Sequence, residues 1–260
     1  MVLSRDWVCV RIASYENEEE GNYLKKMYRG RTGELNNTTF ALVAPDGKTL
    51  LAPSGRGPEF VIGARATPNG AAEPESRRSF ALKLEKEAMA FKAKADIKAL
   101  PQSLDFRRAL NIAACDNQPL VVAYAKSATT LKKLESTLAT YAWNKEFVGR
   151  LQYIMVSNRE DLSMLGELPE GDFIAVVEPG QFGLDGTILQ HQPADRVLLD
   201  SGRVQLRLKS LLQAGLEAFQ RQGLSRGEHR RQGRQAQAQW ETVMPVTDEG
   251  KPGSERRPPR

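Results

Sequence analysis

The sequence predicts an α/β protein made of three-layer units, in which helices flank a central mixed sheet, followed by a disordered basic tail. Three observations lead to this fold class. Short apolar runs of the kind that parallel sheets bury alternate with amphipathic helical stretches. Asp-Gly pairs lie in turns between neighbouring apolar runs. Beyond residue 220, Gln, Arg, Gly and Pro replace the apolar periodicity. We therefore predict one unit over residues 1–100, a second over 101–220 and a tail over 221–260.

The first unit is predicted from four patterns. A β-branched run comes first, and an acidic stretch then precedes a short amphipathic helix, at the positive end of its dipole. Asp46-Gly47 lies between two apolar runs, which is a strong hairpin signal. A stripe of apolar residues at helical spacing follows a Gly- and Pro-rich loop. These patterns predict a strand over residues 7–12, a helix over 16–28, hairpin strands over 39–43 and 49–51, and a helix over 79–100.

The second unit alternates strand and helix patterns more closely. Ser103-Leu104-Asp105 offers an N-cap to a helix that carries Phe106, and the polar cluster around Asn117 ends that helix. After residue 119, short continuous apolar runs predict buried strands, and apolar residues at helical spacing predict helices. They predict strands over residues 120–125, 151–156, 173–177 and 186–189, and helices over 130–143, 162–165 and 204–219.

The net charge of +5 is concentrated at the carboxyl end, where residues 221–260 carry +4 of it. The remaining chain is nearly neutral, which argues against a nucleic-acid groove across the folded units, because such grooves need concentrated Lys and Arg. The densest basic stretch is formed by Arg226, Arg230, Arg231 and Arg234. Two interpretations stay open: a solvated tail, or a segment that binds RNA, DNA or anionic lipid.

Cysteine and histidine are too few for a disulfide framework or a Cys-rich zinc site. Cys9 and Cys115 are far apart and no CxxC occurs, while His191 and His229 lack metal-ligand spacing. Cys9 lies in an apolar run, so we expect a buried, inert thiol. The alternative is a peroxide- or metal-sensing thiol helped by nearby Arg11. The sequence therefore predicts no metal site and no cofactor, with Cys9 as the weak redox candidate.

No apolar run approaches the roughly 20 residues that a membrane-spanning helix requires. The first residues also lack the apolar core of a signal peptide. We therefore expect a soluble chain without a membrane span, and the sequence leaves its compartment open.

The order of the elements over residues 102–220 resembles the thioredoxin fold. In that family the strand matched by residues 120–125 runs into a WCxxC motif that opens the next helix, but here Lys126 to Lys132 contain no thiol. The family also has a cis-proline before its next strand, where this chain has Glu170-Gly171-Asp172. The resemblance therefore implies the fold without the two redox features.

Residues 7–95 resemble the back half of a second thioredoxin-like copy, with Thr38-Thr39 where the family has proline and threonine. The first strand and the motif helix of that copy would precede Met1. A sheet without its first strand would expose an apolar edge, and such edges pair readily with another strand. We therefore expect a protein partner, or a second copy of this chain, to bind through the first unit.

These observations favour a non-catalytic module for protein interaction or scaffolding. Thiol exchange needs a thiolate of lowered pKa at a helix N-terminus and a second cysteine to resolve the mixed disulfide. Ser127 or Thr129 at that helix start can cap the helix but cannot exchange electrons. Two alternatives remain: a redox protein whose active half lies upstream or on a partner chain, and polyanion binding through the basic tail.

Overall fold

The structure is a computed structural model of the chain, which divides into two compact units. One unit comprises residues 1–94 and 239–260, and the other comprises residues 95–238. The residues that the structure describes are 7, 12, 17–27, 40–54, 74–91, 99–198, 201–220, 223, 225, 227, 228, 231 and 232.

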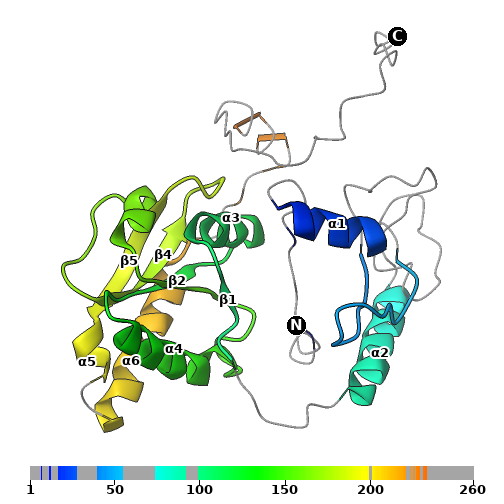
Figure 1. Cartoon of the computed structure of the whole chain (residues 1–260), viewed down its shortest axis with the longest axis horizontal. Helices are drawn as coiled ribbons and strands as arrows, with labels where there is room; N and C mark the ends of the chain where they lie inside the picture. The colour runs from blue at the N-terminus through cyan, green and yellow to red at the C-terminus, as the bar shows by residue number, and fades with distance from the viewer. Residues whose placement is uncertain are drawn as a thin grey trace. The chain divides into compact units, whose positions relative to one another are not determined.

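A five-stranded mixed sheet forms the centre of the second unit (Figure 1). The strand order is β1-β3-β2-β4-β5; β1 and β2 run parallel to β3, while β4 runs antiparallel to both β2 and β5. This confirms the prediction of an α/β unit with a mixed sheet in this part of the chain. The strands are β1 (Gln102–Ser103), β2 (Leu120–Tyr124), β3 (Gln152–Val156), β4 (Phe173–Pro179) and β5 (Gly186–Pro193).

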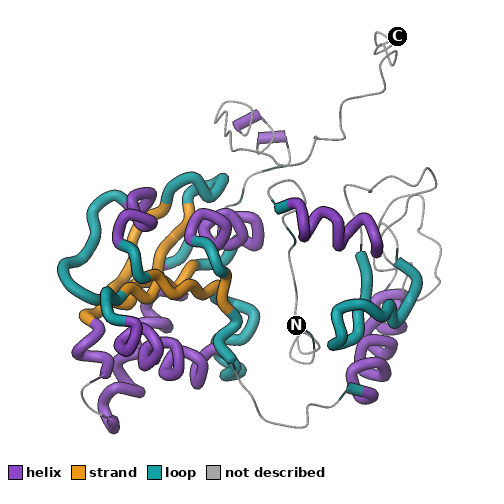
Figure 2. Tube along the Cα trace, viewed as in Figure 1, coloured by secondary structure: helices purple, strands orange, loops and turns teal. Residues whose placement is uncertain are grey.

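Helices cover both faces of this sheet, as Figure 2 shows. One face packs against α3 (Phe106–Asp116) and the 3-10 helix η3 (Arg159–Leu165). The other face packs against α4 (Ala128–Ala142), α5 (Ala194–Leu198) and α6 (Ser201–Ala218). The three predicted layers are therefore present in the second unit.

The alternation of side chains explains why β2 is an uninterrupted apolar run. Leu120, Val122 and Tyr124 belong to the core on the α3 side, whereas Val121 and Ala123 belong to the core on the α4 side. All five side chains are buried. A strand covered on both faces has no position left for a polar residue, which is why its sequence shows no period of two.

Capping residues set the helix ends where the sequence predicted them for α3. Asp105 is the N-cap, and its carboxylate accepts the Arg108 N–H at 2.7 Å. Asn117 ends the helix in the left-handed region, with φ at 52°. Helix α4 begins at Ala128, two residues before the predicted start, because the Ser127 side chain accepts the Thr130 N–H and acts as the N-cap.

Three elements of the second unit differ from the sequence predictions. Strand β1 was not predicted, since its two residues are polar and it is recognised only by its pairing with β3. Helix α5 was not predicted either, since its five residues carry no periodic pattern. Strand β5 continues to Pro193 instead of ending at residue 189, because its polar second half pairs with β4 through the backbone.

A β-bulge interrupts the pairing of β4 with β5. Val176 pairs with Gln190 and Val177 pairs with Ile188, so Leu189 has no direct partner on β4. Bulges of this kind bend the strand that carries them and increase its local twist. Strand β5 is therefore kinked near its middle.

The described part of the first unit contains α1 (Glu18–Met27), α2 (Pro74–Ala90) and the predicted hairpin. The hairpin is reduced to one antiparallel bridge between Val43 and Leu50, so the predicted strands over 39–43 and 49–51 are too long for the residues described. The predicted strand over 7–12, with Cys9, lies outside the described residues except for Trp7 and Ile12, and neither is in a strand. Helix α2 ends before residue 100, and Leu100 is not helical.

A small core supports this unit. Leu42 and Ala52 are buried, and partly buried side chains of α2 and the hairpin pack against them. The rings of Phe40 and Phe80 meet edge to face, with centroids 5.6 Å apart. The stripe predicted for this helix comprised Phe80, Leu84, Ala88 and Phe91, and the structure confirms its first half, because Phe80 and Leu84 pack against this core. Phe91 follows the end of α2 and is exposed.

The Asp46-Gly47 motif is a turn. The Asp46 carboxylate accepts the Thr49 hydroxyl at 2.6 Å and the N–H groups of Lys48 and Thr49 at 2.8 and 2.9 Å. These bonds, led by the one from the Thr49 hydroxyl, lower the pKa of Asp46 to about 2. The carboxylate is thus fully used within its own turn.

Most of the predicted disordered tail, residues 221–260, lies outside the described residues. Four described residues of this segment are helical: Gly227, Glu228, Arg231 and Gln232. The tail therefore contains helical turns where the sequence composition predicted disorder.

Tyr153 on β3 has a buried hydroxyl group without a hydrogen-bond partner among the described residues. It is 2% exposed, and its hydroxyl forms no hydrogen bond. Burial raises the pKa of this phenol. Replacing Tyr153 by Phe removes an unsatisfied group at nearly constant shape, so we expect Tyr153→Phe to raise the free energy of unfolding by about 1 kcal/mol. Urea denaturation checks this, and a loss of stability would contradict it.

Candidate functional site

The carboxyl end of β2 and the first turn of α4 form the part of the second unit where the predicted resemblance would place a redox motif. Lys126, Ser127 and Thr129 are exposed there. The Ser127 carbonyl accepts the Leu131 N–H at 2.9 Å, which begins the helix ladder. No residue from Lys126 to Lys132 carries a thiol. The groups available at this turn are therefore hydroxyls and amines.

Asp172 links this turn to the strand that follows it in space. Its Oδ1 accepts the Lys126 N–H at 3.1 Å, and its carbonyl accepts the Ala194 N–H at 2.9 Å. Asp172 immediately precedes β4, and the described peptide bonds, including those at residues 170–173, are all trans. One residue therefore ties together the starts of α4, β4 and α5.

Arg159 holds the loop that leads into β4. Its guanidinium donates to the carbonyls of Pro169 at 2.6 Å and of Leu168 and Gly171 at 3.4 Å each. The same group lies over the ring of Tyr124, 5.6 Å from the centroid. Arg159 therefore holds the loop over residues 168–171 in place by donating to the backbone of its own chain.

A shallow hollow of about 450 Å³ lies along the outer side of α4. Its described lining comes from that one helix. Among the described residues, no histidine, cysteine or carboxylate is hydrogen-bonded to the hydroxyls of Ser127, Thr129 or Ser136, so none of these hydroxyls has a base beside it. The lining residues are Ala128, Thr129, Lys132, Lys133 and Ser136.

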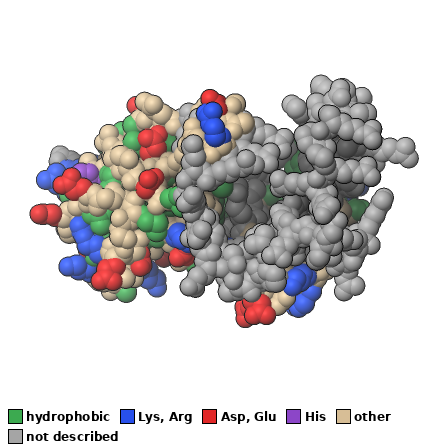
Figure 3. Space-filling model, turned by 90° about the horizontal axis from the view of Figure 1, so that it is seen from above, with side chains coloured by type: hydrophobic (Ala, Val, Ile, Leu, Met, Phe, Trp, Pro, Cys, Tyr) green, Lys and Arg blue, Asp and Glu red, His purple; other side chains and the backbone are tan. Residues whose placement is uncertain are grey.

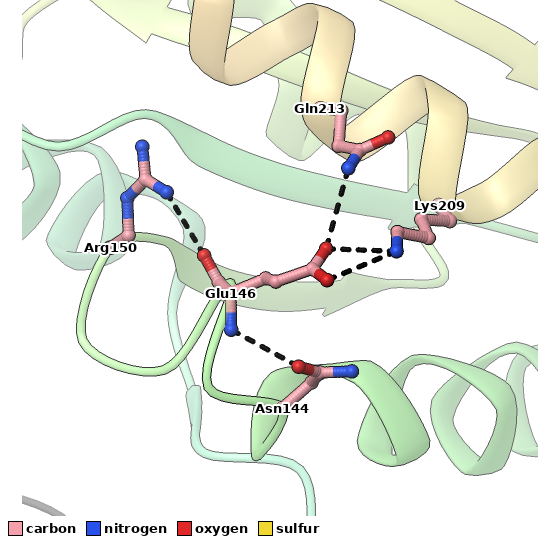
Figure 4. Close-up of polar contacts among 5 residues, drawn as sticks. All are labelled: Asn144, Glu146, Arg150, Lys209 and Gln213. Carbon is pink, nitrogen blue, oxygen red and sulfur yellow. Dashed lines mark hydrogen bonds and ion pairs between the residues drawn. The ribbon is translucent and has the colours of Figure 1, made fainter.

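A second polar cluster joins the loop after α4 to α6 (Figure 4). The Glu146 carboxylate accepts Lys209 at 3.0 and 3.1 Å and Gln213 at 3.3 Å, both from α6. Within the loop, the Glu146 N–H donates to Asn144 and the Glu146 carbonyl accepts Arg150. The two ion-pair side chains are 39% and 36% exposed, so the pair contributes at most about 1 kcal/mol. Its effect is to orient α6 against the loop.

Of the predicted site residues, Arg231 alone belongs to the part of the chain that the structure describes. Cys115 is exposed near the end of α3, at the opposite end of β2 from Ser127. Cys9 and His229 lie outside the described residues, and His191 is exposed on β5. Of the four tail arginines, only Arg231 is described. Within the described ranges, no group of three His, Cys, Asp or Glu side chains could hold a metal ion.

The described surface carries both signs of charge. Lys and Arg alternate with Asp and Glu over the second unit in the view of Figure 3. This distribution fits the nearly neutral body deduced from the sequence. The face seen in this view has no patch of a single sign of the kind that concentrates a charged ligand.

Comparison of the chain with protein-family models, curated proteins and solved structures found no significant match. None of the helices in the described part of the chain has both the length and the apolar character to cross a membrane.

Arg159, Asp172 and Glu146 were not singled out from the sequence. The sequence feature that could have indicated Arg159 and Asp172 is their position beside buried strands, because loops at strand ends meet at one edge of a sheet. Nothing in the sequence indicates that Arg159 bonds three carbonyls instead of a carboxylate. The contact between Glu146 and α6 spans more than 60 residues and has no sequence pattern.

Proposed function

We propose that this chain is a non-catalytic thioredoxin-like protein that acts as an interaction or scaffolding module. The observation that carries the proposal is the strand order β1-β3-β2-β4-β5, with three parallel strands followed by an antiparallel pair. The resemblance itself rests on the order of elements along the chain, in which the hairpin of β4 and β5 follows two βα crossovers. This order is combined with a turn after β2 in which Ser127 and Thr129 stand in place of thiols.

The contacts at this turn support a role without catalysis. Asp172 and Arg159 both bond the backbone of their own chain, which fixes the loops at the carboxyl end of β2. Rigid loops of this kind suit a scaffold, because they present one surface without a reactive group. Cys115 lies at the other end of the strand and has no second cysteine among the described residues.

We expect the protein not to reduce insulin disulfides with dithiothreitol as the electron source. Reduction requires a thiolate and a resolving thiol, and the turn from Lys126 to Thr130 contains neither. Insulin turbidity measures the reaction, with a thioredoxin as positive control. Turnover comparable to that control, abolished by Cys9→Ser and retained by Cys115→Ser, would instead identify Cys9 as a redox residue and reject the proposal.

Exposed apolar side chains on α2 support an interaction through the first unit. Leu82 is 57% exposed and Met89 is 69% exposed, whereas Phe80 and Leu84 of the same helix face the small core. A seven-residue spacing puts Leu82 and Met89 on one side of the helix. The partner that we propose for this apolar side of α2 is a second copy of this chain.

We expect sedimentation velocity of the full chain to show weak, concentration-dependent self-association. Leu82→Lys combined with Met89→Lys should reduce it, since charges replace the apolar contact. Leu206→Lys is the matched control, because Leu206 is 67% exposed but belongs to α6 of the second unit. A chain that stays monomeric up to about 1 mM, or equal effects of both changes, would contradict this part of the proposal.

A further inference from the structure

We propose that the arginine-rich segment over residues 221–234 binds the phosphate backbone of nucleic acids without sequence preference. This function is independent of the interaction role proposed above. The segment contains five Arg, no Lys and one acid, Glu228, so it alone carries a charge of +4. That value equals the charge of the whole tail, whereas the rest of the chain is nearly neutral.

Ser225 and Glu228 form a reciprocal cap at the start of this segment. The Ser225 hydroxyl donates to Glu228 Oε2 at 2.6 Å, the Ser225 N–H donates to the same oxygen at 3.0 Å, and the Glu228 N–H donates back to Ser225 Oγ at 3.3 Å. Reciprocal bonds between positions three residues apart are the capping box that begins a helix. Gly227, Glu228, Arg231 and Gln232 are helical, as this cap requires.

The cap also removes the segment's one acid from competition with a ligand. The hydrogen bond from Ser225 is the main reason why the pKa of Glu228 is lowered, so the carboxylate stays ionised and bound at the helix start. Arg231 is exposed and has no hydrogen-bond or ion-pair partner among the described residues. An exposed guanidinium can donate to the oxygens of an external anion.

The spacing of the arginines suits a linear polyanion. Arg226, Arg230 and Arg234 follow one another at intervals of four residues. In an ideal α-helix, positions four residues apart lie near one side of the helix at steps of about 6 Å. A row of charges at such steps matches a repeating phosphate chain better than a single small anion.

The composition of the segment favours nucleic acid over a membrane. Residues 225–234 contain no hydrophobic side chain, so a helix there has no apolar face to insert between lipids. The cations are all Arg, whose planar fork binds phosphate oxygens in pairs. The anchored end of α6 precedes the segment closely, since the Gln220 N–H donates to Glu178 of β4 at 3.0 Å.

The test measures binding of the full chain to a fluorescein-labelled 20-base-pair duplex DNA by anisotropy at several salt concentrations. Contacts from the four arginines that follow Ser225, at positions 226, 230, 231 and 234, predict a slope of about −3.6 for log K against log salt. This is about a 150-fold loss of affinity between about 50 and 200 mM salt. The triple variant Arg226→Gln/Arg230→Gln/Arg234→Gln leaves one contact and should show a slope of about −0.9. The variant with Lys at the same three positions should keep most of the slope.

Two controls separate the segment from net charge and from disorder. Lys25→Gln/Lys26→Gln/Lys145→Gln removes the same charge from exposed lysines of the folded units and should leave the slope unchanged. Ser225→Ala removes the cap without changing the charge and should weaken binding a few-fold. Equal losses in the arginine and lysine triples, no loss in the arginine triple, or binding to phosphatidylserine vesicles without binding to DNA would each overturn the proposal.

Discussion

Gly183→Ala is expected to lower the free energy of unfolding of the second unit by about 3 kcal/mol. Gly183 lies in the turn between β4 and β5 and has φ at +63°. A Cβ atom there would lie 2.4 Å from the Asn111 Cα and 2.8 Å from the Leu110 carbonyl oxygen, both in the backbone of α3. The helix backbone cannot move aside as a flexible side chain could, so the substitution combines dihedral strain with a steric clash.

Gly171→Ala is the matched control for this prediction. Gly171 has nearly the same dihedral, with φ at +66°, but a Cβ atom there would meet nothing within 4 Å. It should therefore cost only the left-handed strain, about 1 kcal/mol. Urea denaturation followed by Trp143 fluorescence compares the two variants. Equal losses would show that the contact between the turn and α3 is looser than the structure describes.

Gly215→Ala is expected to lower the stability of the same unit by about 2 kcal/mol, although alanine is the better helix former. Gly215 lies in α6 where the helix crosses β4. An added Cβ atom would lie 2.5 to 2.7 Å from three side-chain atoms of Val176, which is fully buried. The glycine thus permits the close approach of α6 to the sheet, and the clash outweighs the gain of about 1 kcal/mol in helix propensity.

A double-mutant cycle tests the cause directly. Val176→Ala removes the side-chain atoms that the new Cβ would meet, so Gly215→Ala should cost much less in that background. Gly227→Ala is the control at a helical glycine with nothing within 4 Å, and it should leave stability unchanged or slightly raised. An additive cycle would place the cost of Gly215→Ala elsewhere than at Val176.

The sequence predicted well those elements whose stabilising contacts leave a pattern in consecutive residues. Strands β2 and β4 are buried on both faces and therefore show as apolar runs, and Asp105 shows as a cap because its side chain bonds its own neighbours. Strand β1 has only two polar residues and exists through its pairing with β3. Such an element has no local signal, because its stabilising bonds come from a strand 50 residues away.

The candidate site was predicted only in outline. The absence of thiols between Lys126 and Lys132 follows from the sequence alone. The bond from Lys126 to Asp172 does not, because it depends on β4 lying antiparallel beside β2. The helical cap in the tail could have been recognised, since Ser225 and Glu228 have the spacing of a capping box. The capping box was not recognised, because the residues around it have the composition of disordered segments.

The bulge at Leu189 limits how the second unit can associate. Strand β5 is an outer strand of the sheet and contains no charged residue, so its sequence alone offers little protection against growth of the sheet by an added strand. The bulge bends the strand between Ile188 and Gln190, so an incoming straight strand could follow only half of its length. A ladder of half the length forms too few hydrogen bonds to offset the entropy that an incoming strand loses on docking. Strand addition at this edge is therefore disfavoured by the shape of the backbone and not by charge.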